Sequence, residues 1–483
     1  MTKNTAPFFG REYELGVLHN LFNKRSASLV ICRGRRRIGK STLIQKFGAE
    51  SDVFVQFQGL PPRKGGTARE QLDAFSEQLS RQTTVPRVGI DSWDKAFFLL
   101  GGQVKKEART VILFDEISWM AADAPDFAGY LKIAWDTLFT SFPSLVLVLC
   151  GSVSSWIEKN ILNNTGFVGR VSVTLTLEQL PLHTCNRFWG PRTERVSSYE
   201  KLRFLAVCGG VPRYLKEVVP AEDTALTVRR LCFTPDGMLF NEFEQIFHDI
   251  FSRRADIYRT IAETLSDAPC SQSQIAALMD KERSGYLGAC LSDLELSGFI
   301  RKFDIGTLGY RNRSRLHQYR IIDNYLRFYL KYVAPLAVKI RQGLYRDAGL
   351  ESVIPWDTVL GIQFETLVIN NLITVLRLLQ IDPVSVLRAG PYMQRVTNRT
   401  QACQVDLLIE TRHTVFVGEI KCRRAIGADV IDEVAEKMAR LRPPAGKTMR
   451  PFLVCEGAVG ADVAAGRFFD RIITFADMLA ATV

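Results

Sequence analysis

The sequence lacks any long hydrophobic run. None of its 483 residues lies within eighteen consecutive apolar residues, the length with which a helix can cross the hydrocarbon core of a membrane. The opening MTKNTAP also lacks the basic stretch followed by an apolar stretch that marks a secretory signal. These absences argue against a helical membrane protein, and they predict a cytoplasmic protein with no membrane partner.

Paired cysteines and internal repeats are missing as well. The ten cysteines stand singly, without a C-x-x-C pair, and Cys32 and Cys150 lie inside apolar runs. Such cysteines are typical of small buried hydrophobic side chains in a reducing compartment. A zinc site is therefore not expected.

Acidic residues are in the minority. The chain holds 62 Lys and Arg against 51 Asp and Glu, a formal net charge of +11. This balance favours contact with nucleic acid and makes double-stranded DNA a candidate partner, with solubility alone as the alternative explanation of a charge of this size. Hydrophobic residues make up 47% of the chain, enough for packed cores, and the length predicts two to four domains.

The most informative feature that is present is a glycine-rich loop, GRRRIGKS, at residues 34–41. It fits the pattern G-x-x-x-x-G-K-[ST], and it stands between an expected strand at 28–32 and an expected helix at 42–47. Glycines let the backbone N–H groups turn toward phosphates, and the helix N-terminus adds partial positive charge. The loop predicts binding of ATP or ADP, with Lys40 on the β- and γ-phosphates and the Ser41 hydroxyl on Mg²⁺. The predicted nucleotide-binding residues of this loop are Gly34, Arg35, Arg36, Arg37, Ile38, Gly39, Lys40, Ser41 and Thr42.

An apolar run at 111–114 ends in two carboxylates, Asp115 and Glu116. A buried parallel strand has this pattern, and its carboxyl end lies at the edge of the sheet where ligands bind. We expect Asp115 to hold the Mg²⁺ shell and Glu116 to act as the general base for the attacking water. The alternative is a strand that ends in ordinary surface acids.

Two further residues are candidates for the same reaction. Ser152 follows an expected strand at 145–149, where its hydroxyl would sense the γ-phosphate or, alternatively, cap a helix at 154–159. Arg170 is a candidate for an arginine that stabilises the transition-state charge, or it is a plain surface residue.

Four segments together resemble the archaeal-type ATPases, relatives of the AAA+ and STAND P-loop proteins. They are FGREYEL at 9–15, the arginine-rich loop, the Asp-Glu strand end, and GGVP at 209–212. The resemblance covers nearly the whole chain and implies an α/β fold: a parallel P-loop sheet with a helical lid, a winged helix-turn-helix and a C-terminal restriction-endonuclease-like domain. It also implies that Gly10 and Arg11 lie by the nucleotide base and Pro212 against the adenine side. Alternatively, Pro212 is only a helix breaker in a loop.

The order of the motifs and the loop-forming residues between them divide the chain into four expected parts. These are an ATPase core at 1–195, a lid at 196–249, a winged helix at 250–335 and a nuclease-like domain at 336–483. In the third part, helical spacing at 256–265, 275–279 and 284–297 precedes two strand-like runs at 298–303 and 316–322. Between these runs, Arg311, Arg313 and Arg315 would meet DNA phosphates, unless the winged helix only joins domains.

The last part holds a second candidate site. Asp406 lies in an expected strand at 405–409, and Glu419 and Lys421 share one face of the next strand. Asp406 and Glu419 would bind Mg²⁺ beside the Ile420 carbonyl, and Lys421 would orient the nucleophile or stabilise the transition state.

This pattern, with Glu365 as the upstream acid, resembles the PD-(D/E)xK nuclease fold. Gln404 stands where such proteins often have Glu, which leaves an auxiliary metal position in doubt. The alternative is a decayed site that keeps only an ion pair.

Together these patterns predict a Mg²⁺-dependent ATPase that switches a nuclease-like, DNA-associated tail. One alternative is a signalling ATPase whose C-terminal domain binds a partner protein without cutting DNA. Another is a DNA-remodelling motor, a homo-oligomeric ring in which Arg170 enters a neighbouring site.

Overall fold

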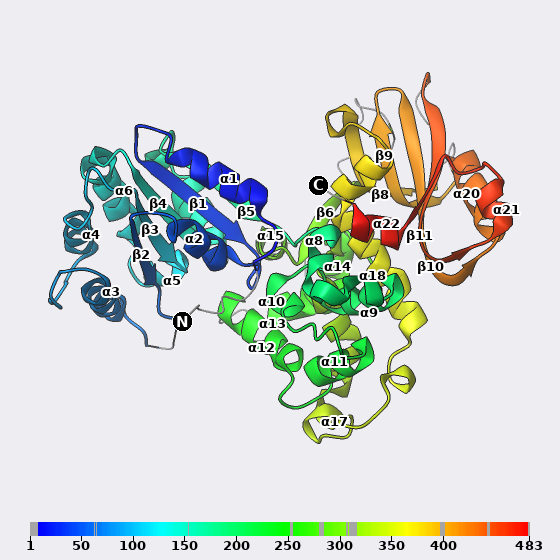
Figure 1. Ribbon diagram of the computed structural model, residues 1–483, viewed down its shortest axis with the longest axis horizontal. Helices are drawn as coiled ribbons and strands as arrows, with labels where there is room; N and C mark the ends of the chain where they lie inside the picture. The colour runs from blue at the N-terminus through cyan, green and yellow to red at the C-terminus, as the bar shows by residue number, and fades with distance from the viewer. Residues whose placement is uncertain are drawn as a thin grey trace.

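The computed structural model describes residues 8–61, 63, 65–152, 154–251, 255–279, 285–305, 308, 316–396, 401–441 and 445–481. Figure 1 shows two β-sheets at opposite ends of the molecule, with a helical region between and below them. The N-terminal sheet lies at the left in blue and cyan, and the C-terminal sheet lies at the upper right in orange and red.

The first sheet has five parallel strands in the order β2-β3-β4-β1-β5. Their bounds are β1 (Ser28–Gly34), β2 (Val53–Gln58), β3 (Thr110–Asp115), β4 (Leu145–Gly151) and β5 (Val171–Leu177). Strands β3 and β4 are buried along their whole length, as expected for the centre of a sheet that is covered on both faces. This sheet confirms the parallel α/β fold that the sequence predicts.

Alternate residues of β1 feed two apolar layers. Val30 and Cys32 pack with Leu43 and other residues of α1 and α2, whereas Leu29 and Ile31 pack on the opposite face against α3, α4 and α6. The helices and short turns of this part are α1 (Glu12–Leu21), α2 (Lys40–Gly48), α3 (Ala68–Gln82), α4 (Trp93–Gly101), α5 (Ile117–Met120), α6 (Phe127–Thr137), η1 (Phe139–Ser141), α7 (Ser154–Ile157), η2 (Glu158–Leu162) and η3 (Thr165–Phe167). All ten cysteines of the chain are free, and all except Cys422 are buried.

The middle of the chain is mostly helical. Its helices and turns are α8 (Leu182–Asn186), η4 (Arg187–Arg195), α9 (Ser198–Cys208), α10 (Pro212–Leu215), α11 (Thr224–Cys232), α12 (Met238–Phe251), α13 (Ala255–Asp267), α14 (Gln272–Leu278), α15 (Gly285–Leu296), α16 (Asn324–Phe328), η6 (Tyr329–Val333), η7 (Ala334–Leu336), α17 (Ala337–Arg341) and η8 (Leu350–Ser352). After α15, strands β6 (Ile300–Ile305) and β7 (Leu316–Ile321) form an antiparallel hairpin. Three helices followed by a hairpin is the element order that the sequence predicts here. Arg311, Arg313 and Arg315 lie outside the described residues.

The C-terminal sheet is mixed, with the order β12-β11-β10-β9-β8. The pairs β8–β9 and β9–β10 are antiparallel, and the pairs β10–β11 and β11–β12 are parallel. Its elements are α18 (Trp356–Asn370), α19 (Leu372–Leu378), η9 (Pro383–Ser385), β8 (Val386–Gln394), β9 (Cys403–Thr411), β10 (Thr414–Ile426), α20 (Asp429–Arg440), β11 (Thr448–Val459), α21 (Ala461–Ala465), β12 (Arg471–Thr474) and α22 (Phe475–Ala480). One apolar cluster extends from Leu180 to Leu479, so the expected lid, winged-helix and nuclease-like parts pack around a shared core.

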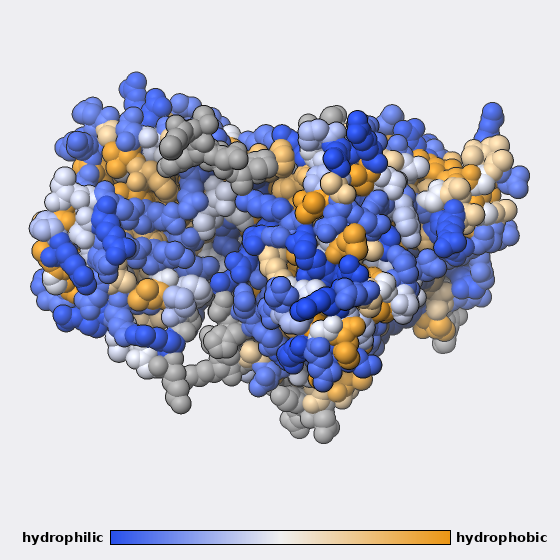
Figure 2. Space-filling model, turned by 60° about the horizontal axis from the view of Figure 1, so that its bottom comes forward, coloured by the Kyte–Doolittle hydropathy of each residue, from blue (hydrophilic) through white to orange (hydrophobic). Residues whose placement is uncertain are grey.

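Among the described residues, no single helix has the length and apolar composition to cross a membrane. Helices α18 and α19 reach the required length only together, and they are bent by 78° at the break between them. The face shown in Figure 2 is mainly hydrophilic, with hydrophobic residues in small patches.

The start of the glycine-rich loop depends on a residue without a Cβ. Gly34 has a φ of 143°, and a Cβ built on it would lie 2.3 Å from the Leu177 carbonyl oxygen of β5. We therefore expect Gly34→Ala to lower the free energy of unfolding by roughly 2–4 kcal/mol, through backbone strain and steric overlap. Thermal unfolding followed by circular dichroism would measure this change.

Gly16→Ala is the matched control, because a Cβ at this position in α1 meets nothing within 4 Å. That substitution should be neutral or stabilising by about 0.5–1 kcal/mol. Equal melting temperatures for the two variants would contradict the close approach of β1 and β5.

Candidate functional site

The glycine-rich loop forms the turn between β1 and α2. Gly39, at φ 91°, precedes α2, and Lys40 is the first residue of the helix. The buried Lys40 ammonium donates hydrogen bonds to the carbonyl oxygens of Gly34 (3.0 Å) and Arg35 (3.1 Å). The loop thus curves around its own lysine, and the first backbone N–H groups of α2 are available to an anion.

A cavity of about 310 Å³ lies over this loop. Its volume is at the lower end of the range for small-molecule sites. The residues that line it are Phe8, Phe9, Arg11, Arg36, Arg37, Ile38, Gly39, Lys40, Ser41, Thr42, Gln58, Asp115, Glu116, Leu180, Phe188, Pro212, Arg213 and Lys216. The fold therefore brings most of the predicted nucleotide-site residues to one cavity. Gly34 and Arg35 instead line a neighbouring cavity of about 230 Å³.

The acidic residues lie at the carboxyl edge of the sheet, as predicted. Asp115 is buried at the end of β3, and its Oδ1 accepts a hydrogen bond from the Glu116 N–H (3.1 Å). Glu116 has a φ of 51°, a left-handed conformation that is strained for a residue with a side chain and is concentrated at functional sites. The Ser41 hydroxyl and the Asp115 carboxylate line one cavity, and they are suitable ligands for Mg²⁺.

Ser152 reaches the same edge from the neighbouring strand. Because β3 and β4 are adjacent and parallel, their carboxyl ends meet. The Ser152 hydroxyl donates a 2.9 Å hydrogen bond to Oε2 of Glu116. This hydroxyl thus contacts the expected general base. A helix-capping role alone does not explain that contact.

Residues from outside the sheet close the cavity. Arg11 has a φ of 70°, and its guanidinium bonds the Glu178 carbonyl oxygen (2.5 Å) and the Glu14 carboxylate (3.0 Å). Pro212 begins α10 and also lines the cavity, so it is a helix-starting residue that faces the loop. Gly10 is not one of the described lining residues, and a Cβ on it would lie 2.9 Å from the Thr184 side chain.

Arg170 lies outside the residues described as lining either cavity near the loop. It forms a two-point ion pair with Asp136 of α6, with N–O distances of 2.6 and 2.9 Å. The hydrogen bond from Arg170 is the main reason why the pKa of Asp136 falls to about 2. Within one chain, therefore, Arg170 pairs with α6 and is not one of the described residues at the nucleotide cavity, and its role in a neighbouring copy stays a prediction.

The second candidate site lies at the junction of β9, β10 and α20. The Ile420 N–H donates to Oδ2 of Asp406 (3.0 Å), which ties the two strands together. Glu419 is only 1% exposed, and its two oxygens contact the ammonium groups of Lys421 and Lys437, each at 2.6 Å. These residues line a cavity of about 700 Å³ together with Gln404.

Glu433 and Lys437 are residues of this site that the sequence reasoning missed. They lie on α20, one turn apart, and the Glu433 carboxylate accepts hydrogen bonds from both Lys421 and Lys437. Their i, i+4 spacing is the only signal in the sequence, and it is common on solvated helices.

Burial raises the pKa of Asp406 to about 7, and the nearby carboxylates of Glu419 and Glu365 add to this effect. Glu365 is not one of the described lining residues of this cavity, and it pairs with Arg320 of β7 at 2.7 Å. Both oxygens of Glu419 are held by lysines, and the described residues offer no group of three or more His, Cys, Asp or Glu placed for a metal ion. In this arrangement the site does not fit the Mg²⁺ that the sequence motif implies.

Comparisons with known proteins give partial matches, and no family model matches the chain. An uncharacterized protein of Methanocaldococcus jannaschii, MJECL04, is 20% identical over 396 residues, covering 80% of this chain and 82% of the relative. The uncharacterized ATP-binding protein MJ0423 of the same organism is 48% identical over 40 residues, covering 8% of this chain and 68% of the relative.

Two solved structures from archaea are also similar. The Walker-type ATPase paby2304 of Pyrococcus abyssi has a TM-score of 0.48 at 16% identity, covering 67% of this chain and 96% of its own. The ORC2 protein of Aeropyrum pernix, in ADPNP–ADP complexes, has a TM-score of 0.42 at 13% identity. The match covers 71% of this chain and 98% of the ORC2 chain. With its phosphate loop, its parallel sheet and its close match to MJ0423, the chain belongs to the archaeal-type P-loop ATPases.

Proposed function

We propose that the chain binds ATP over the loop at 34–42 and hydrolyses it with Mg²⁺. The observation that carries this proposal is the meeting of Asp115, Glu116 and Ser152 at the sheet edge that faces Lys40 and Ser41. The loop supplies positive charge and N–H donors, and the strand ends supply carboxylates. An ATP-binding relative with 48% identity over 40 residues supports the same reading.

Each residue has a role that follows from its place. The Lys40 ammonium would turn from the loop carbonyls to the β- and γ-phosphates. Ser41 and Asp115 would hold Mg²⁺, which neutralises charge on the phosphates. Glu116 would accept a proton from water as the water oxygen bonds the γ-phosphorus and the bond to the bridging oxygen breaks.

Ser152 would fix the direction of the Glu116 carboxylate during this step. A base that is oriented by a neighbouring hydrogen bond needs less reorganisation when the water attacks. The left-handed backbone at Glu116 would serve the same end by holding a residue that lines the cavity in one conformation.

The proposed function of the remaining parts is that of a switch. ATP binding would alter how the helical middle lies against the P-loop sheet, and the middle shares its core with the C-terminal sheet. The hairpin of β6 and β7, with its helices, is proposed as a winged helix that contacts double-stranded DNA, and the C-terminal sheet as a nuclease-like domain.

A second candidate for the C-terminal domain is a binding module that cuts nothing. The ion pairs of Glu419 with Lys421 and Lys437 favour it, because these ammonium groups occupy the oxygens that a metal would need.

Lys40→Ala should raise the dissociation constant for ATP by about a hundredfold or more, which abolishes detectable binding at ordinary ATP concentrations. The reason is that the charged contact to two phosphates is lost. Titration of the purified protein with ATP by isothermal calorimetry would measure the change. Lys46→Ala, in the last turn of α2, is the control and should bind ATP like the parent. Equal affinity of the Lys40→Ala variant and the parent would remove the loop from the proposed site.

Glu116→Gln should keep ATP binding and lower the hydrolysis rate by about 10²–10⁴, the usual contribution of a general base. Phosphate release under saturating ATP would measure it. Glu107→Gln, an exposed acid in the loop before β3, is the control and should turn over normally. Turnover at the parent rate in Glu116→Gln would exclude Glu116 as the base.

Asp406→Ala and Lys421→Ala should each abolish Mg²⁺-dependent cutting of DNA if the C-terminal domain is a nuclease. Labelled DNA incubated with and without ATP and Mg²⁺ would show the fragments, and Asp462→Ala, exposed on α21, is the control. A parent that binds DNA in a salt-dependent way but never cuts it would favour the binding module instead.

A further inference from the structure

A charge is buried behind the phosphate loop. The side chain of Arg35, the second residue of the loop, is 3% exposed, and its Nε lies 2.5 Å from Oδ2 of Asp323, which is 0% exposed. A buried guanidinium without a counter-charge is strongly disfavoured, so the two residues require each other. Asp323 does not belong to the P-loop sheet, because it lies between β7 and α16.

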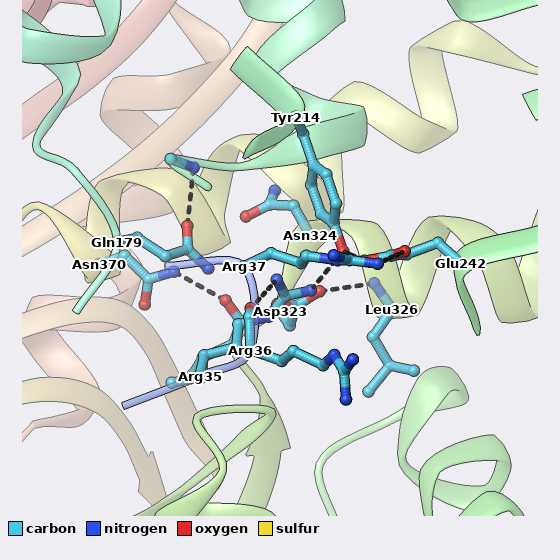
Figure 3. A network of polar contacts seen from close by, with 12 residues as sticks. Arg35, Arg36, Arg37, Gln179, Tyr214, Glu242, Asp323, Asn324, Leu326 and Asn370 are labelled. Carbon is cyan, nitrogen blue, oxygen red and sulfur yellow. Dashed lines mark hydrogen bonds and ion pairs between the residues drawn. The ribbon is translucent and has the colours of Figure 1, made fainter. Parts of the chain in front are cut away.

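The neighbouring contacts make this pair part of a network (Figure 3). Arg35 donates from Nη2 to the Tyr214 hydroxyl (3.3 Å), and that hydroxyl donates to Glu242 (3.2 Å). Glu242 in turn holds Arg37 through two hydrogen bonds of 2.9 and 3.2 Å. Two arginines of the loop are therefore fixed by α10, α12 and the start of α16.

The backbone of Arg35 links this network to the nucleotide site. Its carbonyl oxygen is one of the two acceptors for the Lys40 ammonium. The contacts of the Arg35 guanidinium restrict how far this residue can move, and thereby restrict the carbonyl that accepts from Lys40. A preformed loop binds phosphate more tightly than one that must be ordered by the ligand.

We infer that Asp323 is a positioning residue for the nucleotide: acting through Arg35, it sets the shape of the phosphate loop and thereby the affinity for ATP. It does so although it is not one of the described residues that line the nucleotide cavity. The inference rests on the proposed ATP binding, and it adds a requirement that the P-loop motif alone does not contain.

The segment around Asp323 is itself fixed to the C-terminal part. Asn324 and Gln363 of α18 exchange hydrogen bonds between side-chain amides and backbone carbonyls, at 3.1 and 2.7 Å. Arg327 donates to the Thr366 hydroxyl at 2.8 Å. The counter-charge of the loop is thus supplied by a segment that also contacts α18.

Asp323→Asn is the test variant because it separates charge from shape. Oδ1 of Asp323 caps α16 by accepting from the Leu326 N–H (2.7 Å), and Asn preserves such a cap while it removes the charge. We expect this variant to bind ATP at least tenfold more weakly than the parent, by isothermal calorimetry on the full chain. Arg35→Lys should weaken binding similarly, because a lysine keeps the charge but cannot reproduce the contacts of the planar guanidinium.

Thr366→Val is the matched control. It removes a buried hydrogen bond from the same segment, on the side away from the loop. We expect its melting temperature to fall as that of Asp323→Asn does, while its affinity for ATP stays within twofold of the parent.

Two results would overturn the inference. One is parent-like ATP affinity in both Asp323→Asn and Arg35→Lys. The other is an equal loss of affinity in Thr366→Val, which would mean that general destabilisation, and not the charge, is responsible. A parent that binds no ATP would instead refute the proposed function, and this inference with it.

Discussion

The shape of the phosphate loop depends on one buried ion pair, between Arg35 and Asp323. The guanidinium of Arg35 cannot reach water, so the chain must supply a carboxylate, and Asp323 supplies it from a distant part of the sequence. The loop therefore keeps its shape only when the helical middle of the protein is folded against the P-loop sheet. This dependence joins the P-loop sheet to Asp323, which is not one of the described residues that line the nucleotide cavity.

The two candidate sites differ in how their charges are arranged. At the P-loop sheet, Asp115 and Glu116 face a cavity lined by Lys40 and Ser41, so a phosphate and a cation can enter between groups of opposite sign. At the C-terminal sheet, Glu419 is already neutralised by Lys421 and Lys437. At the first site a ligand needs the Lys40 ammonium to turn from two loop carbonyls, whereas at the second site the ion pairs of Glu419 must open before a metal can bind. The structure thus gives more support to ATP hydrolysis than to DNA cleavage.

Much of the nucleotide site could be predicted from the sequence, because its parts obey local rules. A loop of fixed spacing follows one strand, two carboxylates end another, and parallel strands bring their carboxyl ends to one edge, which is why Ser152 meets Glu116. The contacts that could not be predicted are those between distant segments. Asp323, Glu242 and Lys437 are ordinary charged residues on helices or turns, and no spacing rule links them to Arg35, Arg37 or Glu419. Arg170 is the converse case, since the sequence analysis made it a candidate for catalysis, whereas the structure pairs it with Asp136 of α6.

The central claim is that a triphosphate lies over residues 34–42 at the start of α2. A crystal structure of the full chain with Mg²⁺ and a non-hydrolysable ATP analogue tests it most directly. The account predicts the β- and γ-phosphates within hydrogen-bonding distance of the Lys40 ammonium and the loop N–H groups, with the cation between Ser41 and Asp115. A loop that stays closed on Lys40 in saturating analogue, or an analogue bound elsewhere, would contradict it.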